Sequence, residues 1–172
     1  MKTEIIISIV GTDQDGFIND LTLKTKALGG RWLANKIAHL DGQIAGLLKM
    51  EIDTEQLDAF KAMVAEYSHI NADFHDVLLY QQHPKQSVQL TVEGEDRGGL
   101  TSDITRLLFD KGIKVEHFES QRFPVIGLGT GVFEAHLDLS LPSSTSVETL
   151  KENLESLGGG LRVFVSEPAN AS

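Results

Sequence analysis

Two short loops carry the residues whose types and spacing could bind a small molecule. Both follow the pattern Gly-x-Asp-x-x-Gly-apolar, once at residues 11–17 and again at residues 94–100. Glycine lets a backbone turn tightly with its amides accessible, and a helix that starts there presents unpaired N–H groups and partial positive charge to a carboxylate. Asp13 and Asp96 could cap the helices or accept an ammonium group. Each loop therefore offers partners for both ends of an amino acid.

The candidate ligand-binding residues lie on these loops and on the strand that follows each helix. In the first half of the chain they are Asp13, Asp15, Gly16, Phe17, Ile18 and Asn35. In the second half they are Asp96, Gly98, Gly99, Leu100, Thr101 and His117. A purely structural interpretation stays open, because a glycine-rich strand-to-helix turn is ordinary architecture and a solvent-exposed strand face accounts equally well for the polar strand residues.

The sequence gives little support for metal binding, phosphate binding or catalysis. His117 and His136 fall on neighbouring predicted strands, but the sequence has no HExxH motif and no set of three or four converging metal ligands. The glycine-rich run at 127–131 lacks the Lys-Ser/Thr of a phosphate loop, and a strand rather than a helix is expected after it. No nucleophile–base pair or cofactor motif is found. We therefore expect no catalytic residues, no metal and no cofactor.

Charge and composition narrow the function classes further. The formal net charge is −10, with 7 basic and 12 acidic residues in 1–83 and 8 and 13 in 84–172, so each half carries −5. Nucleic-acid affinity comes largely from neutralised phosphates, and we expect no direct nucleic-acid binding. The sequence contains no cysteine, no signal-like start and no apolar run long enough to cross a bilayer. We expect a soluble, cytoplasmic protein with no membrane contact.

An internal duplication organises the chain. At a constant offset of 83, five positions around the two loops are identical: Gly11/Gly94, Asp13/Asp96, Gly16/Gly99, Asp20/Asp103 and Thr22/Thr105. The offset also pairs the alternating apolar residues upstream, Ile5, Ile7 and Ile9 with Val88, Leu90 and Val92. Agreement across a strand, a loop and a helix indicates two copies of one structural unit.

Each copy predicts the same series of elements. In the first copy we expect a strand over 5–9, a helix over 17–28, a hairpin over 31–52 that turns at Asp41-Gly42, a helix over 57–67 and a strand over 74–79. In the second copy we expect a strand over 88–92, a helix over 100–111 and a hairpin whose strands, 113–123 and 132–141, flank a loop at 124–131. A helix over 147–157 and a strand over 161–165 follow. Asp53 with Gln56, and Thr145 with Glu148, resemble capping boxes. The second helices of the two copies align at an offset of 93, with Leu57 opposite Leu150.

This order predicts an α+β protein of two ferredoxin-like βαββαβ domains, each an antiparallel sheet with helices on one face. Domain 1 is expected over residues 1–83 and domain 2 over residues 84–172, with His83–Gln86 as the linker.

The doubled loop motif on βαββαβ units resembles the tandem ACT-domain family over essentially the whole chain. Among its members, the repressor-type proteins of glycine cleavage are the most similar. The resemblance implies binding of a small amino acid, glycine in particular, at the loops and at domain interfaces, often in a homodimer. It also implies action through a partner that is itself a transcriptional regulator. The family loop usually has proline before its second glycine, where this sequence has Asp15 and Gly98.

The sequence is compatible with a regulatory amino-acid sensor or an ACT-fold interaction module without ligand binding. An enzyme is the third hypothesis and has the least support in the sequence. Asp15 places a negative charge beside an anion-seeking helix start, and Gly98-Gly99 makes the second loop more flexible. If one copy alone binds a ligand, we expect it to be the second. The loop at 124–131 could form a lid or a partner contact.

Overall fold

The computed structural model describes residues 1–78, 86–127 and 129–166, and the chain forms two compact units that are treated separately. The change from one unit to the next falls within residues 79–85, outside the described part. The predicted boundary between 83 and 84 and positions 83–85 of the predicted linker fall there too, so they stay predictions. The fourth linker residue, Gln86, is instead the first residue of a strand, because it pairs with Leu141.

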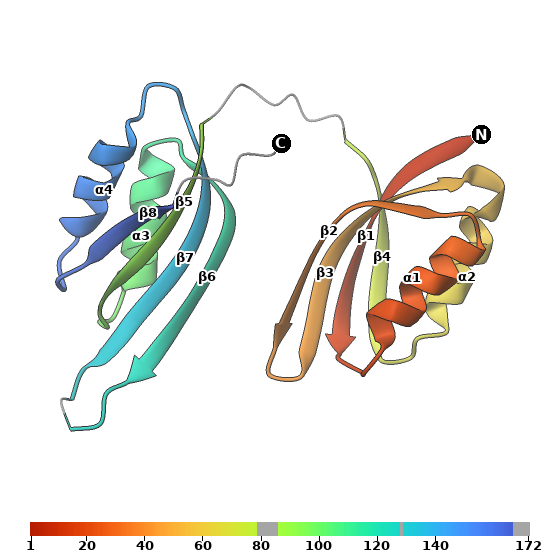
Figure 1. Ribbon diagram of the computed structural model, residues 1–172, viewed down its shortest axis with the longest axis horizontal. Helices are drawn as coiled ribbons and strands as arrows, with labels where there is room; N and C mark the ends of the chain where they lie inside the picture. Colours follow the sequence, from red (N-terminus) through yellow and green to blue (C-terminus); the bar gives the residue numbers. More distant parts are fainter. Residues whose placement is uncertain (79–85, 128, 167–172) are drawn as a thin grey trace. The chain divides into compact units, whose positions relative to one another are not determined.

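The first unit is a four-stranded antiparallel sheet with two α-helices on one face (Figure 1). Its strand order is β2-β3-β1-β4. The elements are β1 (Lys2–Thr12), α1 (Phe17–Ala27), β2 (Arg31–Leu40), β3 (Gln43–Asp53), the short 3₁₀ helix η1 (Thr54–Gln56), α2 (Leu57–Ala65) and β4 (Ile70–Asp76).

The second unit repeats this arrangement, with strand order β6-β7-β5-β8 and two helices on one face (Figure 1). Its elements are β5 (Gln86–Glu95), α3 (Leu100–Asp110), β6 (Lys114–Pro124), β7 (Gly131–Leu141), α4 (Val147–Glu155) and β8 (Arg162–Ser166). The two edge strands carry a register shift at the same place, between Trp32 and Ala34 in β2 and between Val115 and His117 in β6, 83 residues apart. The predicted fold class and the duplication are confirmed.

Alternation along the central strands builds each core. Ile7 of β1 pairs with Leu48 of β3, and Leu90 of β5 pairs with Leu137 of β7; all four side chains lie under the helices and are buried. Each unit has its own cluster of buried residues. Because residues two apart point to the same face of a strand, the predicted period-two pattern places every second residue in the core.

Several predicted details were wrong. The helices α2 and α4 end two residues before the predicted 67 and 157, and β4 begins at Ile70 rather than at Phe74, whereas α1 and α3 match their predicted bounds to within one residue. Neither capping box forms: η1 precedes α2, and Ser146 rather than Thr145 caps α4 by accepting from the Thr149 amide. The buried residues of α2 and α4 correspond at an offset of 90, as in the pairs Phe60/Leu150 and Val64/Leu154. The predicted offset of 93 was wrong by three residues, which is nearly one helical turn.

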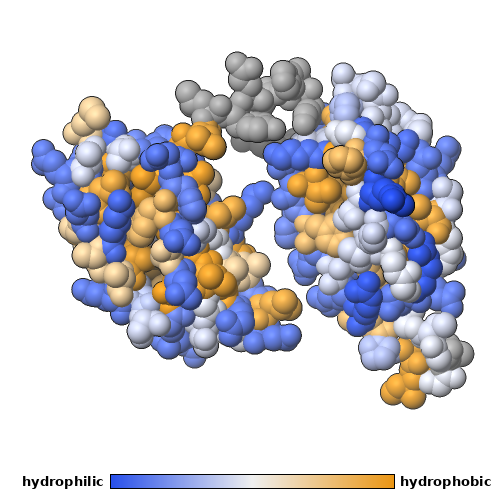
Figure 2. All heavy atoms as spheres, turned by 180° about the vertical axis from the view of Figure 1, so that it is seen from behind, coloured by the Kyte–Doolittle hydropathy of each residue, from blue (hydrophilic) through white to orange (hydrophobic). Residues whose placement is uncertain are grey.

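The two hairpins differ at their turns. Asp41 and Gly42 turn the first with φ angles of 46° and 77°, as their sequence predicts. The second hairpin, β6–β7, has a longer connection, and its tip exposes apolar side chains (Figure 2), including the fully exposed Ile126. Among the described helices, none has the length and apolar character needed to cross a membrane.

Candidate functional site

The two helix-start loops have nearly the same backbone conformation. Gly16 precedes α1 with φ 81° and ψ 0°, and Gly99 precedes α3 with φ 80° and ψ −1°. This left-handed conformation suits glycine, because other L-residues meet a steric penalty there. The sequence therefore places glycine where the turn into each helix requires it.

No side chain caps either helix start. The Phe17 amide donates to the Gln14 carbonyl over 3.1 Å, and the next intrahelical bond runs from the Asp20 amide to the Gly16 carbonyl. The amides between them, such as that of Ile18, have no acceptor within the helix. The second loop repeats this pattern, with the Asp103 amide donating to the Gly99 carbonyl over 2.9 Å. Each loop thus offers first-turn amides to an anion.

The structure overturns a capping role for the loop aspartates. Asp13 and Asp96 are the first residues after β1 and β5, and their amides donate to the carbonyls of Gly42 and Gly131 over 2.9 and 2.8 Å. Gly16 and Gly99 occupy the cap positions instead. The aspartate side chains turn toward the edge strands β2 and β6.

Each loop aspartate meets a nitrogen-bearing side chain at the same repeat position. His39 of β2 has Nε2 3.5 Å from Oδ2 of Asp13. Arg122 of β6 donates from Nε to Oδ1 of Asp96 over 3.0 Å. His39 and Arg122 are 83 residues apart, which is the repeat offset. The two pairs are therefore equivalent contacts in the two copies, made by different side chains.

Arg122 makes further contacts that its counterpart lacks. Its Nη2 donates to the hydroxyl of Thr101, in the first turn of α3, over 3.2 Å. Its guanidinium carbon lies 5.4 Å from the ring centroid of Phe133, a distance at which a cation interacts with an aromatic face. Arg122 therefore links the loop, the first helical turn and the strand β7.

A second arginine holds the other side of this loop. Arg97 has Nη2 2.7 Å from Oδ2 of Asp103 and donates to the Leu157 carbonyl over 3.0 Å. The repeat offset places Gln14 at this position in the first copy. Arg97 and Arg122 were not among the sequence-predicted residues. The offset of 83 aligns Arg122 with His39 and Arg97 with Gln14, but it does not show that either arginine contacts the loop.

The first copy uses a different group of contacts around its helix. Tyr67 donates to Oδ2 of Asp20 over 2.6 Å, and Lys24 Nζ lies 2.9 Å from the same oxygen. The hydrogen bond from Tyr67, and then that from Lys24, holds the pKa of Asp20 below its ordinary value. Burial, and then the bond to Asp20, raises the pKa of the Tyr67 phenol. These contacts join α1 to the turn before β4 without touching the loop.

The remaining candidate residues on the loops differ in how exposed they are. The side chains of Phe17 and Leu100 are buried in the cores, so a ligand at the loops would meet their backbone. Asp15 and Gly98 are exposed, and Ile18 and Thr101 are partly exposed. The space around Gly98 is open, since a Cβ built there meets no atom within 4 Å.

Asn35 and His117 lie on opposite faces of their sheets. Asn35 pairs with the buried Leu48, which places its side chain on the helix-covered face. His117 pairs with Asp138, on the open face, and its Nε2 lies 3.6 Å from Oε2 of Glu119. The two residues are 82 positions apart, one fewer than the repeat, and a one-residue slip reverses the face of a strand residue. The structure therefore does not bring His117 to the helix side of β6.

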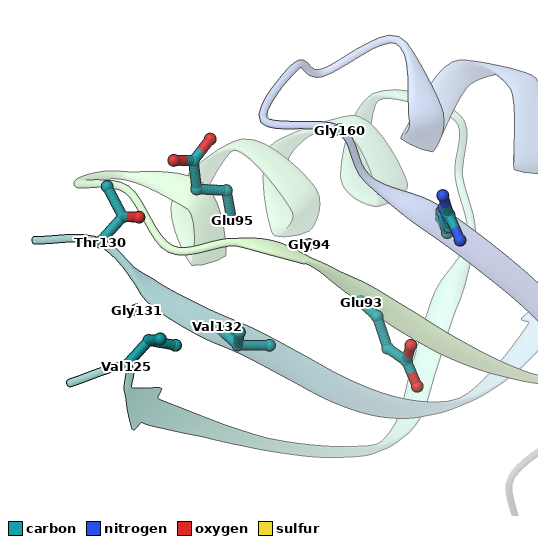
Figure 3. Close-up of a pocket in the computed structure, with 9 residues that line it drawn as sticks. Glu93, Gly94, Glu95, Val125, Thr130, Gly131, Val132 and Gly160 are labelled. Carbon is teal, nitrogen blue, oxygen red and sulfur yellow. The ribbon is translucent and has the colours of Figure 1, made fainter. Parts of the chain in front are cut away.

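An open pocket of about 360 Å³ adjoins the second loop at the end of the sheet. Glu93, Glu95, Val125, Val132 and Arg162 contribute side chains to its wall. The carboxylates of Glu93 and Glu95 point away from each other (Figure 3), so they do not converge on one cation. Within residues 1–78, 86–127 and 129–166, no group of three His, Cys, Asp or Glu side chains could hold a metal ion.

Two βαββαβ units in tandem, each with the Gly-x-Asp-x-x-Gly turn before its first helix, define a tandem ACT-type fold. A Galdieria sulphuraria protein described as unknown has the same fold, with a TM-score of 0.84, 17% identity and coverage of 98% of this chain and 100% of that one. A candidate glycine cleavage system transcriptional repressor is also similar, with a TM-score of 0.67, 15% identity and coverage of 96% and 97%. No protein-family model matches the sequence, and no curated protein matches it.

Proposed function

We propose that the protein is a non-catalytic regulator that binds a small amino acid at its second helix-start loop and acts through a protein partner. The partner proposed is a transcriptional regulator of amino-acid metabolism, and the active form is a homodimer. The observation that carries the proposal is the loop itself: a left-handed Gly99, uncapped first-turn amides and a repeat of the same geometry at Gly16.

A zwitterion of small size fits the chemistry of this loop. First-turn amides and the helix dipole attract a carboxylate. Acidic side chains at the end of β5, such as Glu95, can accept the ammonium group. The space around Gly98 is open, so an amino acid can approach the loop there. Glycine is the simplest ligand with both charged ends.

Ligand size limits the expected affinity. Glycine has five non-hydrogen atoms, and the best small ligands gain at most about 1.5 kcal/mol per atom, so binding cannot exceed about 7.5 kcal/mol. This corresponds to a dissociation constant of a few micromolar at best. A sensor of an abundant metabolite needs no tighter binding, since its affinity has only to match the working concentration.

Action through a protein partner fits the charge of the chain. A net charge of −10, split equally between the halves, opposes direct contact with a phosphate backbone. The exposed apolar tip of the β6–β7 hairpin, which includes Ile126, offers a surface for a protein rather than for nucleic acid. The similarity in fold to a candidate repressor agrees with this proposal.

Calorimetry with each of the twenty amino acids tests the ligand, using the full chain at concentrations where dimers are present. We expect binding of glycine or another small amino acid, with a dissociation constant between about ten micromolar and one millimolar. Absence of heat and of thermal stabilisation for every amino acid at ten millimolar would contradict the proposal. The transcriptional part is tested separately, by comparing transcripts of amino-acid metabolism with and without the protein at high and low glycine.

Asp15 favours a second candidate, an interaction module whose loops bind no ligand. Its carboxylate stands beside Gly16, where it repels an incoming carboxylate, whereas the equivalent Gly98 carries no charge. The substitution Gly98→Phe separates the candidates, because it fills open space at the second loop without changing a left-handed residue. Loss of regulation with retained folding favours the sensor; unchanged regulation favours the module.

A further inference from the structure

Arg122 stands out among the exposed charged residues because it joins three elements at once. It donates to Asp96 on the loop between β5 and α3 and to Thr101 in the first turn of α3, and it lies over the ring of Phe133 on β7. Asp96 precedes Gly99, and Thr101 follows it. The arginine therefore spans the segment whose amides are proposed to bind the ligand.

We propose that Arg122 is the positioning residue of the second loop: it holds residues 96–101 in their ligand-ready conformation and compensates the charge of Asp96. This inference rests on the proposed ligand binding at that loop. Arg122 fixes the loop from both sides of the left-handed Gly99, which otherwise leaves the turn free to move. A guanidinium suits this task because its planar fork can donate to two partners at fixed directions.

Charge compensation matters because the ligand brings a carboxylate. An uncompensated Asp96 would repel it, as Coulomb energies between like charges a few ångströms apart reach about 1 kcal/mol even in water. Arginine stays protonated at every physiological pH, so the compensation in the second copy is permanent. Only half of the Arg122 side chain is exposed, which leaves it less screened than a free surface arginine.

The first copy provides a natural comparison. His39 occupies the equivalent position, reaches Asp13 alone at 3.5 Å and is charged only when protonated. Arg122, in contrast, contacts Asp96, Thr101 and the ring of Phe133. A histidine placed at position 122 should make the compensation of Asp96 depend on pH, because histidine changes charge between about pH 5 and pH 8.

The test uses the ¹⁵N-labelled full chain with glycine as the probe, followed by nuclear magnetic resonance. We expect Arg122→Met to weaken glycine binding at the second loop about tenfold, the loss expected for a charge-assisted hydrogen bond. Arg122→Lys keeps the charge but not the fork, and should recover part of the affinity. Arg122→His should bind glycine nearly as well as wild type at pH 6 and several-fold more weakly at pH 8. The charged or polar groups facing this residue in the described structure are Asp96 and Thr101.

His39→Met is the matched control, because it removes the equivalent residue from the other copy. It should leave glycine binding at the second loop unchanged. Wild-type affinity in Arg122→Met, or a pH profile of Arg122→His identical to that of the wild type, would overturn the proposal. Equal losses from His39→Met and Arg122→Met would also overturn it.

Hydrogen exchange without any ligand separates this proposal from the proposed function. The amides of Asp96, Leu100 and Asp103, which donate to the carbonyls of Gly131, Arg97 and Gly99, should exchange about tenfold faster in Arg122→Met than in the wild type. A local opening that loses about 1.4 kcal/mol becomes ten times more populated. Unchanged exchange overturns the positioning role even if glycine binds. If the wild type binds none of the twenty amino acids, the proposed function fails, and faster exchange still supports the positioning role.

Discussion

The Nε atom of Arg122 donates to Oδ1 of Asp96 over 3.0 Å, and the same contact recurs 83 residues earlier between His39 and Asp13. A repeat that preserves this contact while changing its chemistry indicates that the two loops share a conformation but not a charge environment. The second loop is held by two arginines, whereas the first has a histidine and a glutamine at those positions.

The left-handed glycine gives the first prediction. Gly99→Ala should lower the free energy of unfolding by about 1–2 kcal/mol, because its φ of 80° penalises any L-residue although the space around it is open. Gly98→Ala is the matched control: its surroundings are equally open and its φ lies outside the left-handed region, so it should be neutral or slightly stabilising. Urea denaturation measures both, and equal effects would contradict this account of the turn.

The glycine one residue before the end of β1 and of β5 gives the second prediction. A Cβ at Gly11 would meet the His69 carbonyl oxygen at 2.0 Å, and one at Gly94 would meet the Leu161 Cδ2 atom at 2.5 Å. Backbone cannot move aside as a leucine side chain can. Gly11→Ala should therefore cost about 3 kcal/mol of unfolding free energy and Gly94→Ala clearly less. The reverse order in thermal or urea unfolding would show that the strand contacts are not as described.

The Tyr67–Asp20 hydrogen bond gives a prediction about pH. Because the folded-state pKa of Asp20 is lowered, its ionised form stabilises the fold above its ordinary pKa, and this contribution is lost as pH falls through the lowered value. Tyr67→Phe should move the pKa of Asp20 back toward the ordinary value. Carboxyl ¹³C titration measures it. Glu51, whose pKa the Lys2 hydrogen bond lowers, is the internal control and should not change.

Asp15 gives a prediction about the first loop. Asp15→Asn removes one negative charge beside the first-turn amides of α1 and should strengthen binding of an amino-acid carboxylate there about threefold. Glycine titration with signals resolved for each loop measures the change. Binding at the second loop serves as the control and should stay the same. No change at the first loop would show that Asp15 does not decide between the two copies.

The sequence pattern was sufficient for the fold, because alternation such as Ile5, Ile7, Ile9 and the constant offset of 83 report burial and duplication directly. It failed at the caps, because a glycine in the left-handed conformation takes the cap position and carries Asp13 and Asp96 away from the helix amides. Local motifs cannot reveal that change of partner.

Arg122 escaped prediction for a related reason. It lies 26 residues from Asp96, and the contact depends on which face of β6 the residue occupies. The register shift between Val115 and His117 determines that face, and no sequence pattern predicts this shift. His117 and Asn35 lie on opposite faces for a simpler reason: they are 82 positions apart, so the repeat of 83 makes His117 equivalent to Ala34 rather than to Asn35.

A crystal structure of the full chain grown with a saturating mixture of small amino acids tests the central claim most directly. We expect one zwitterion at the second loop, with its carboxylate on the amides that follow Gly99, and weaker or no density at the first loop beside Asp15. Density at the first loop alone, or an amino acid bound away from both loops, would contradict it.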